Sequence, residues 1–310
     1  MKIRELYTEF QPETIKEMEY REVCSDGQTA IKKRSVLVEH VIDIYINHIL
    51  TMKLICIPTM LTELVLGRLL TEGMISSVED VEEIYICRYG KQAFVTLRTG
   101  QETEAHPNDH REPAFESLAA RDEKSYEQVI AIEEKSTLSN REASSKYIET
   151  TPSCCTGNRV LNDYFIKELP RKKIQAIRWK AEWIYALSKR FEEGMPLHSK
   201  TGATHSCFLM KEGEIVFTCE DIGRHNALDK AIGYALRHGI DLKTCIAFSS
   251  GRIPTDMAEK AIAAGIPILA TKASVSDAAI ALAEEYGLTL LGKCRRREFA
   301  EFTGSRPYFD

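Results

Sequence analysis

Long apolar runs are absent from this 310-residue chain, and none approaches the roughly 20 residues that a membrane-spanning helix needs. Residues 1–6 soon give way to polar and acidic positions and do not form an apolar signal region. The formal net charge is only −5, so nucleic acid and anionic membranes are not indicated as partners, and any anion site must be built locally. The chain also lacks internal repeats and low-complexity tracts. These absences predict a globular protein of the cytoplasm.

A disulfide framework is also absent. Nine cysteines are scattered singly along the chain, apart from the adjacent pair Cys154 and Cys155. The odd number leaves at least one thiol unpaired within a monomer, and the spacing is unlike that of secreted disulfide-rich domains. We expect most of these cysteines to be small buried hydrophobic residues.

The hydrophobic content of 44% allows a sizeable core, and the length suits one large or two moderate domains, of which we expect two. Residues 1–110 combine β-rich runs with one clear helix over 60–70, which indicates a small α+β module. Residues 111–150 are charged and polar and indicate an exposed connection. The predicted β-rich runs lie at 36–38, 42–46 and 54–57.

Residues 151–310 are predicted to form an α/β domain. After Pro170, apolar residues recur at helical spacing as far as Phe191, which predicts a long helix. Further on, strands and helices alternate, so we expect a sheet with parallel connections and helices packed on its faces. The predicted strands are 244–248, 266–270 and 288–292, and the predicted helices are 255–264 and 276–286. Ligands on such sheets bind in the loops beyond the carboxyl ends of the strands.

One strand-to-helix turn, residues 220–229, is unusually rich in polar and cationic side chains. Gly223 permits close backbone approach, and the helix that follows presents free backbone N–H groups, an arrangement that suits an anion. An ordinary helix cap would account for Asn226. It would not account for Asp221, Arg224, His225 and Asp229 together. The turn therefore predicts a ligand site.

Three later loops repeat this pattern of polar residues at predicted strand ends. A lone serine before a helix is usually only a cap, and a basic run is usually a solvated surface. Together, however, such loops suit an extended polyanionic nucleotide, because arginine forks match phosphate oxygens. The residues concerned are Ser250, Gly251, Arg252, Ser274, Lys293, Cys294, Arg295, Arg296, Arg297 and Glu298.

The adjacent thiols of Cys154 and Cys155 lie in a loop of small residues. A thiolate in such a loop, with cations nearby, can accept a sulfane sulfur as a persulfide and pass it on. Arg159 and the basic residues around 167–173 would provide the positive field. The alternative is a pair of buried cysteines without chemistry, and the local sequence leaves both interpretations open.

Several ordered motifs resemble the FdhD/NarQ family, sulfurtransferases that mature the molybdenum cofactor of formate dehydrogenases. The resemblance rests on residues 220–233, on 42–47 followed by 66–75, and on 201–205, 249–252 and 290–295. Ordered matches spread over about 250 residues are much more specific than one short motif.

The resemblance implies a persulfide on Cys155, with Cys154 as the competing assignment. The best-known family pattern separates two cysteines by two residues, and this chain departs from it. The resemblance also implies a cysteine desulfurase as sulfur donor, bis(molybdopterin guanine dinucleotide) as the bound cofactor, GDP-like nucleotides as surrogates, an apo-formate dehydrogenase as acceptor, and a homodimer. A further hypothesis is that Asp221 or Asp229 accepts hydrogen bonds from the guanine edge.

The implied C-terminal fold is a three-layer α/β domain similar to cytidine deaminases, which makes a nucleotide deaminase one alternative. A zinc deaminase requires a Pro-Cys-x-x-Cys element, and the spacing at Pro152, Cys154 and Cys155 does not fit it. No metal is expected at His205 or His225, since neither has further donors at a familiar ligand spacing. The other alternative is a non-catalytic chaperone that shelters the cofactor and docks on the apoenzyme.

Overall fold

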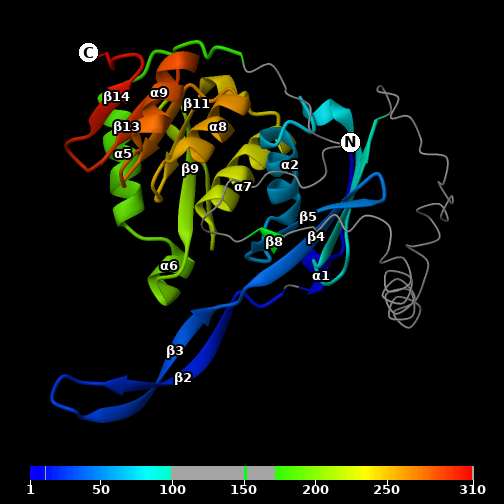
Figure 1. Ribbon diagram of the computed structural model, residues 1–310, viewed down its shortest axis with the longest axis vertical. Coiled ribbons are helices and arrows are strands. Elements are labelled where there is room, and N and C mark those ends of the chain that lie inside the picture. Colours follow the sequence, from blue (N-terminus) through cyan, green and yellow to red (C-terminus); the bar gives the residue numbers. More distant parts are fainter. Residues whose placement is uncertain (11, 99–149, 152–171, 309–310) are drawn as a thin grey trace. The chain divides into compact units, whose positions relative to one another are not determined.

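The computed structural model describes residues 1–10, 12–98, 150–151 and 172–308 (Figure 1). They belong to one compact unit, formed by residues 1–98 and 148–310. The predicted domain boundary at 110 and the cysteine loop lie outside the described residues, and the predicted boundary at 150 falls on the short strand formed by residues 150–151. Within the described ranges, no helix is long and apolar enough to cross a membrane.

A mixed six-stranded sheet forms the N-terminal part, in the order β1-β6-β7-β4-β5-β8. At its centre, the β4–β5 hairpin turns through Asn47 and His48, which both adopt positive φ (46° and 71°). Two successive left-handed residues match the twist of the flanking strands, and asparagine tolerates this conformation well. The strands are β1 (Lys2–Glu5), β4 (His40–Ile46), β5 (Ile49–Cys56), β6 (Val81–Ile86), β7 (Gln92–Leu97) and β8 (Thr150–Thr151).

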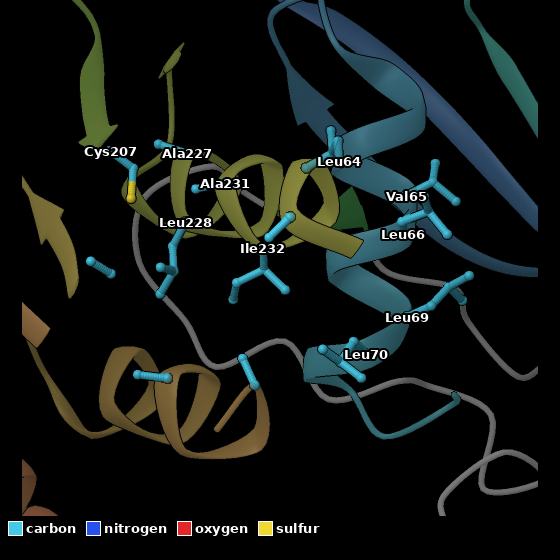
Figure 2. Close-up of a cluster of buried hydrophobic side chains, with 14 of the residues drawn as sticks. Leu64, Val65, Leu66, Leu69, Leu70, Cys207, Ala227, Leu228, Ala231 and Ile232 are labelled. Atoms are coloured by element: carbon cyan, nitrogen blue, oxygen red, sulfur yellow. The ribbon is translucent and has the colours of Figure 1, made fainter. Parts of the chain in front are cut away.

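Helix α2 (Leu61–Thr71) is buried along nearly its whole length because it lies between the N-terminal sheet and helix α7 (Arg224–Arg237). The two helix backbones approach at glycines. A Cβ on Gly67 would lie 1.8 Å from the carbonyl oxygen of Asp229, and one on Gly233 would lie 1.8 Å from that of Glu63. Apolar side chains of both helices fill the surrounding core, as Figure 2 shows. The predicted N-terminal module therefore shares its core with the α/β part.

The second six-stranded sheet has the order β10-β9-β11-β12-β13-β14. Strands β11, β12 and β13 are parallel, as predicted, while β9, β10 and β14 join them by antiparallel pairing. One face packs against α7, α8 and α9, and the other against α5. The bounds are β9 (His205–Lys211), β10 (Glu214–Asp221), β11 (Cys245–Ser249), β12 (Ile268–Thr271), β13 (Thr289–Gly292), β14 (Ala300–Thr303), α5 (Ala181–Glu192), α8 (Thr255–Ala263) and α9 (Asp277–Tyr286).

The prediction of a long helix after Pro170 is wrong for the first half of that helix. Helix α5 begins only at Ala181, and residues 172–179 are not helical. Tertiary contacts hold this segment: the backbone N–H of Ile174 donates to the carbonyl of Tyr286 (2.7 Å), and the fully buried Trp179 donates its indole N–H to the carbonyl of Ser305 (2.9 Å). Trp179 is therefore buried, and Ile174 and Ile177 are partly buried, without a helix.

A separate two-stranded hairpin, β2 (Ile15–Val23) and β3 (Thr29–Leu37), makes no further strand pairing within the described residues. The short helix α6 packs against β3 (Figure 1). The remaining elements are α1 (Tyr7–Phe10), η1 (Val78–Asp80), α6 (Pro196–Thr201) and η3 (Leu242–Thr244).

Candidate functional site: a cation-lined pocket

A cavity of about 540 Å³ opens where α5, α6 and the loops after β11, β12 and β13 meet. This is the edge at which the carboxyl ends of parallel strands bring their loops together. The cavity is lined by Phe191, His198, Gly202, Ala203, Thr204, His205, Ser250, Lys272, Ala273 and Arg295.

Glu220 holds the α6 wall of the pocket. Its buried carboxylate accepts hydrogen bonds from the backbone N–H groups of Leu197 (2.9 Å) and His198 (2.7 Å) and from the hydroxyl of Thr204 (2.7 Å). The ring of His198 also contacts the carbonyl oxygen of Thr204, with Nδ1 at 2.8 Å. One carboxylate thus ties together the start of α6 and the turn that follows it, so Glu220 positions the site without entering it.

The opposite wall is the turn after β11. The hydroxyl of Ser250 accepts the backbone N–H of Ser206 (2.9 Å) and lies 3.2 Å from Nδ1 of His205. The Arg224 side chain packs over Gly251, the residue after Ser250. A Cβ on Gly251 would lie 2.9 Å from both Cβ and Cδ of Arg224. Glycine is therefore required at this turn to admit the arginine.

The charged and titratable side chains that line the pocket are all basic. Burial lowers the pKa of His205, and the neighbouring groups Arg224, His198, His225 and Arg252 lower it further. All these neighbours are basic, and no acidic residue is among the pocket-lining side chains. Moreover, Nε of Arg224 is buried and has no hydrogen-bond partner within the described residues. An anionic ligand would supply the charge and the acceptors that this arrangement lacks.

The residues of the basic loop after β13 lie in three different environments, namely the pocket, the interior and the surface. Arg295 lines the pocket and is held by the carbonyl of Lys272, to which its Nη1 donates at 2.7 Å. Arg296 turns instead to Glu192 of α5. Cys294 is buried, which raises its pKa to about 12. Arg295 and Arg296 are exposed, as are the remaining members of the predicted set, Arg252, Ser274, Lys293, Arg297 and Glu298.

The polar turn before α7 requires a correction, because Asp221 does not face the pocket. It is fully buried and forms an ion pair with the equally buried Lys230 (2.6 Å). It also accepts hydrogen bonds from the backbone N–H of Ile57 (3.1 Å) and from the amide of Asn226 (2.9 Å). These contacts connect α7 to the end of β5, which is a structural function.

Asp229 is likewise interior. It pairs with Arg68 of α2 (3.1 Å) and Lys260 of α8 (3.0 Å) and accepts the hydroxyl of Thr71 (2.9 Å). Burial alone would raise its pKa, but the two cations outweigh burial and lower it. The hypothesis that Asp221 or Asp229 meets a guanine edge is therefore not carried forward, since neither carboxylate is accessible.

His225 and Asn226 are also nearly buried. Nε2 of His225 lies 2.8 Å from a carboxylate oxygen of Asp256, and the Asn226 amide donates to the carbonyl of Ile55 (2.7 Å). From this turn, Glu220 binds the pocket residues His198 and Thr204, and the Arg224 side chain packs against Gly251, which follows the lining residue Ser250. Among the pocket residues, His198 has no counterpart in the sequence prediction. Thr204 lies in the motif 201–205, and Lys272 lies in a loop directly after a strand, and these were the usable signals.

Cys154 and Cys155 lie outside the described residues, so their assignment stays a prediction. Most cysteines that are described are buried, and burial raises the pKa of Cys56, Cys207, Cys219, Cys245 and Cys294. A thiol with a raised pKa is a poor nucleophile. The expectation that most cysteines are packing residues holds for this part of the chain.

Comparison with known proteins agrees with the sequence motifs. The sulfur carrier protein FdhD of Bacillus pumilus is 29% identical over 287 residues, covering 92% of this chain and 93% of that protein. Its counterpart from Geobacillus kaustophilus is 28% identical over 280 residues, covering 90% and 91%. A crystal structure from Desulfotalea psychrophila, named as a formate dehydrogenase accessory protein, shares the fold with a TM-score of 0.67 at 20% identity, covering 94% of this chain and 98% of that one.

The family model for FdhD/NarQ matches residues 37–140 and 114–307, which is most of the chain. Together with the motifs and the full-length relatives, this match shows that the chain belongs to the FdhD/NarQ family.

Proposed function

We propose that this protein is a sulfur carrier, as the names of its relatives state for those proteins, and that it serves a formate dehydrogenase, as the Desulfotalea psychrophila structure is named to do. It would accept sulfur from a cysteine desulfurase as a persulfide on Cys155 and deliver it to the molybdenum cofactor, bound as bis(molybdopterin guanine dinucleotide). Transfer would precede insertion of the cofactor into the apoenzyme. Sulfur transfer would take place in the cytoplasm, and the protein would act as a homodimer.

The observation that carries the proposal is the cation-lined pocket. Lys272, Arg295 and His198 line it, and the unpartnered Nε of Arg224 lies beside it. Phosphate groups of a guanine dinucleotide are anionic and rich in acceptors, so they complement these donors. The cofactor is thus the substrate of the transfer, held by its phosphates.

The sulfur step needs one thiolate. The Cys155 thiolate attacks the sulfane sulfur of the desulfurase persulfide, a new S–S bond forms on Cys155, and the desulfurase cysteine leaves as a thiolate. In delivery, an electron pair of the acceptor attacks the terminal sulfur, so that the bond between sulfur and acceptor forms as the S–S bond breaks. Cys155 leaves as a thiolate, and the acceptor is formally oxidised by two electrons. The role of the pocket is to hold the acceptor while this exchange occurs.

The chaperone alternative uses the same pocket without cysteine chemistry. The deaminase alternative has less support. His110 and Glu112 have the His-x-Glu spacing, but no Pro-Cys-x-x-Cys element accompanies them. Within the described residues, no group of three or more His, Cys, Asp or Glu side chains could hold a metal ion.

The first test is intact-mass analysis after incubation with a cysteine desulfurase and cysteine. We expect a sulfur adduct that is lost in Cys155→Ala and retained in Cys154→Ala. Loss only in Cys154→Ala would exchange the two assignments. An adduct absent from all variants, with GDP binding retained, would support the chaperone alternative.

The second test addresses the pocket. Lys272→Ser should weaken GDP binding by about tenfold, because one phosphate contact removed from a partly desolvated site is worth about 1–2 kcal/mol. Lys243→Ser, which removes an exposed lysine of η3, at the end of β11 away from the pocket loop, is the matched control and should leave the affinity unchanged. Equal affinity of both variants in calorimetry would contradict the assignment of the pocket.

A further inference from the structure

The β2–β3 hairpin exposes more large apolar side chains than an isolated element can maintain without a partner. Met18 is 47% exposed, and Tyr20 and Val36 are each 38% exposed. A free two-stranded hairpin is only marginally stable in water and normally gains stability by packing on another surface. Among the described elements, the short helix α6 packs against it, through β3. The exposed part of the hairpin therefore indicates an interaction surface.

The strand register sorts the side chains into two different faces. Residues directly opposite each other share a face, and successive residues alternate between faces. The pairs Lys16–Val36, Met18–Arg34 and Tyr20–Lys32 therefore lie on one face, which we name the docking face. The pairs Glu17–Ser35, Glu19–Lys33 and Arg21–Ile31 lie on the other.

The docking face carries two cations without an ion-pair partner within the described residues, and the opposite face carries one, Arg21. On the opposite face, both glutamates have partners, since Glu19 pairs with Lys33 (3.8 Å) and Glu17 contacts the Ser35 hydroxyl. On the docking face, Lys32 pairs with Glu22, but Lys16 and Arg34 have no ion-pair partner within the described residues. The docking face thus presents an apolar centre of Met18, Tyr20 and Val36 with unpaired cations beside it. Tyrosine, methionine and arginine are enriched at the centres of protein interfaces.

The docking face also lies beside the pocket. A Cβ on Gly202, a residue of the pocket wall, would lie 3.9 Å from Nη2 of Arg34. Helix α6, which forms that wall, packs against β3 (Figure 1). A protein seated on the docking face would therefore lie next to the pocket and could receive its ligand.

We propose that the docking face binds the acceptor enzyme that takes the pocket's ligand, through an acceptor surface with an apolar centre and carboxylates at its rim. The inference rests on the proposed function, because the acceptor is identified through the ligand it receives. The carboxylates would pair with Lys16 and Arg34, and the apolar centre would cover Met18 and Tyr20. Such a contact depends on ionic strength, since rim charges govern encounter and orientation.

The test measures the affinity of the full-length protein for purified apo-formate dehydrogenase from the same source. The charge-reversed variant Lys16→Glu/Arg34→Glu should bind about tenfold or more weakly, and the loss should shrink as salt is raised. The matched control Arg21→Glu/Lys33→Glu makes the same charge change on the opposite face and should bind as the wild type does. Equal losses in both variants, or none in either, would overturn the proposal.

A second measurement does not depend on how charge reversal affects folding. A photoreactive phenylalanine derivative at Tyr20 should cross-link to the apoenzyme, whereas the same group at Ile31 on the opposite face should not. Cross-linking from position 20 to a second copy of this chain, with none to the apoenzyme, would overturn the proposal in favour of a dimer contact.

Persulfide loading and GDP binding are measured on the same preparations. If both persist while the docking variants bind the apoenzyme normally, only the docking inference is refuted. If the wild type neither takes sulfur nor binds GDP, the proposed function is refuted and the docking inference with it.

Discussion

Replacing Lys230 by methionine should unfold the protein at a much lower temperature. Nζ of Lys230 lies 2.6 Å from Asp221, both side chains are fully buried, and Nζ also donates to the carbonyl of Ile57 (3.3 Å). Burial by itself would lower the pKa of Lys230, but Asp221 more than offsets it, so the pKa is raised and the ion pair persists. Methionine fills similar space but leaves the Asp221 carboxylate in the interior without its counter-charge.

Breaking one partner of a buried ion pair costs about 3–5 kcal/mol. For a chain of this size, each kcal/mol lowers the midpoint of thermal unfolding by roughly 2–4 °C, so a decrease of roughly 6–20 °C is expected. Scanning calorimetry measures it, with Lys243→Met as the exposed control, which should change stability by less than about 0.5 kcal/mol.

A double-mutant cycle separates the ion pair from lost packing. Asp221→Asn alone leaves the lysine uncompensated, whereas Asp221→Asn/Lys230→Met removes both charges. The double variant should therefore be destabilised by about 1–3 kcal/mol less than the sum of the single variants. Additive losses, or a Lys230→Met variant within about 1 kcal/mol of wild type, would refute the interpretation of this pair as a buried structural element.

Three further predictions follow from close contacts and from His205. Gly67→Ala should lower the midpoint of thermal unfolding, because the new Cβ would lie 1.8 Å from the carbonyl oxygen of Asp229. In an ordinary helix the same change is stabilising by about 1 kcal/mol. An unchanged midpoint would contradict the close helix crossing. Gly251→Ala should weaken anion binding in calorimetry while leaving the far-UV circular dichroism intact, since it displaces Arg224. The pKa of His205 is lowered, so the ring is largely neutral near pH 7, and a bound anion favours its protonated form. Affinity for sulfate, whose charge is constant over this range, should therefore rise as the pH falls below about 6.5. His205→Asn should flatten that rise. The same pH dependence in both proteins would exclude His205 as the titrating group.

The prediction of the fold succeeded where local pattern and tertiary environment agree. Strands β11 and β13 and helices α8 and α9 lie within a few residues of their predicted positions, because apolar periodicity and terminal signals such as Gly287 depend on local geometry. The failure over residues 172–179 has a different cause. Ile174 and Ile177 stand at helical spacing with Ala181. However, Ile174 and Trp179 are each fixed by contacts with segments more than a hundred residues away in sequence.

The candidate site was predicted by topology more reliably than by motif. Ser250 and Arg295 lie in loops that the parallel strands bring together, and both line the pocket. In the turn at 220–229, the same carboxylates that suggested a ligand instead bind interior cations. Sequence cannot distinguish these cases, because Asp229 acquires its partners from α2 and α8, which are distant in the chain.

By itself, the sequence determined the mixed α/β class, the strand ends that would carry a site and membership of the FdhD/NarQ family, because periodicity, turn residues and ordered motifs are local properties. Only the tertiary structure decided which polar residues are accessible. Burial depends on what packs over a side chain: α2 against α7 hides Asp229, whereas the turns that Glu220 and Ser250 hold leave Lys272 and Arg295 lining a pocket. The sign of the pocket's charge was likewise a tertiary outcome, since its cations come from segments far apart in a chain whose net charge is −5.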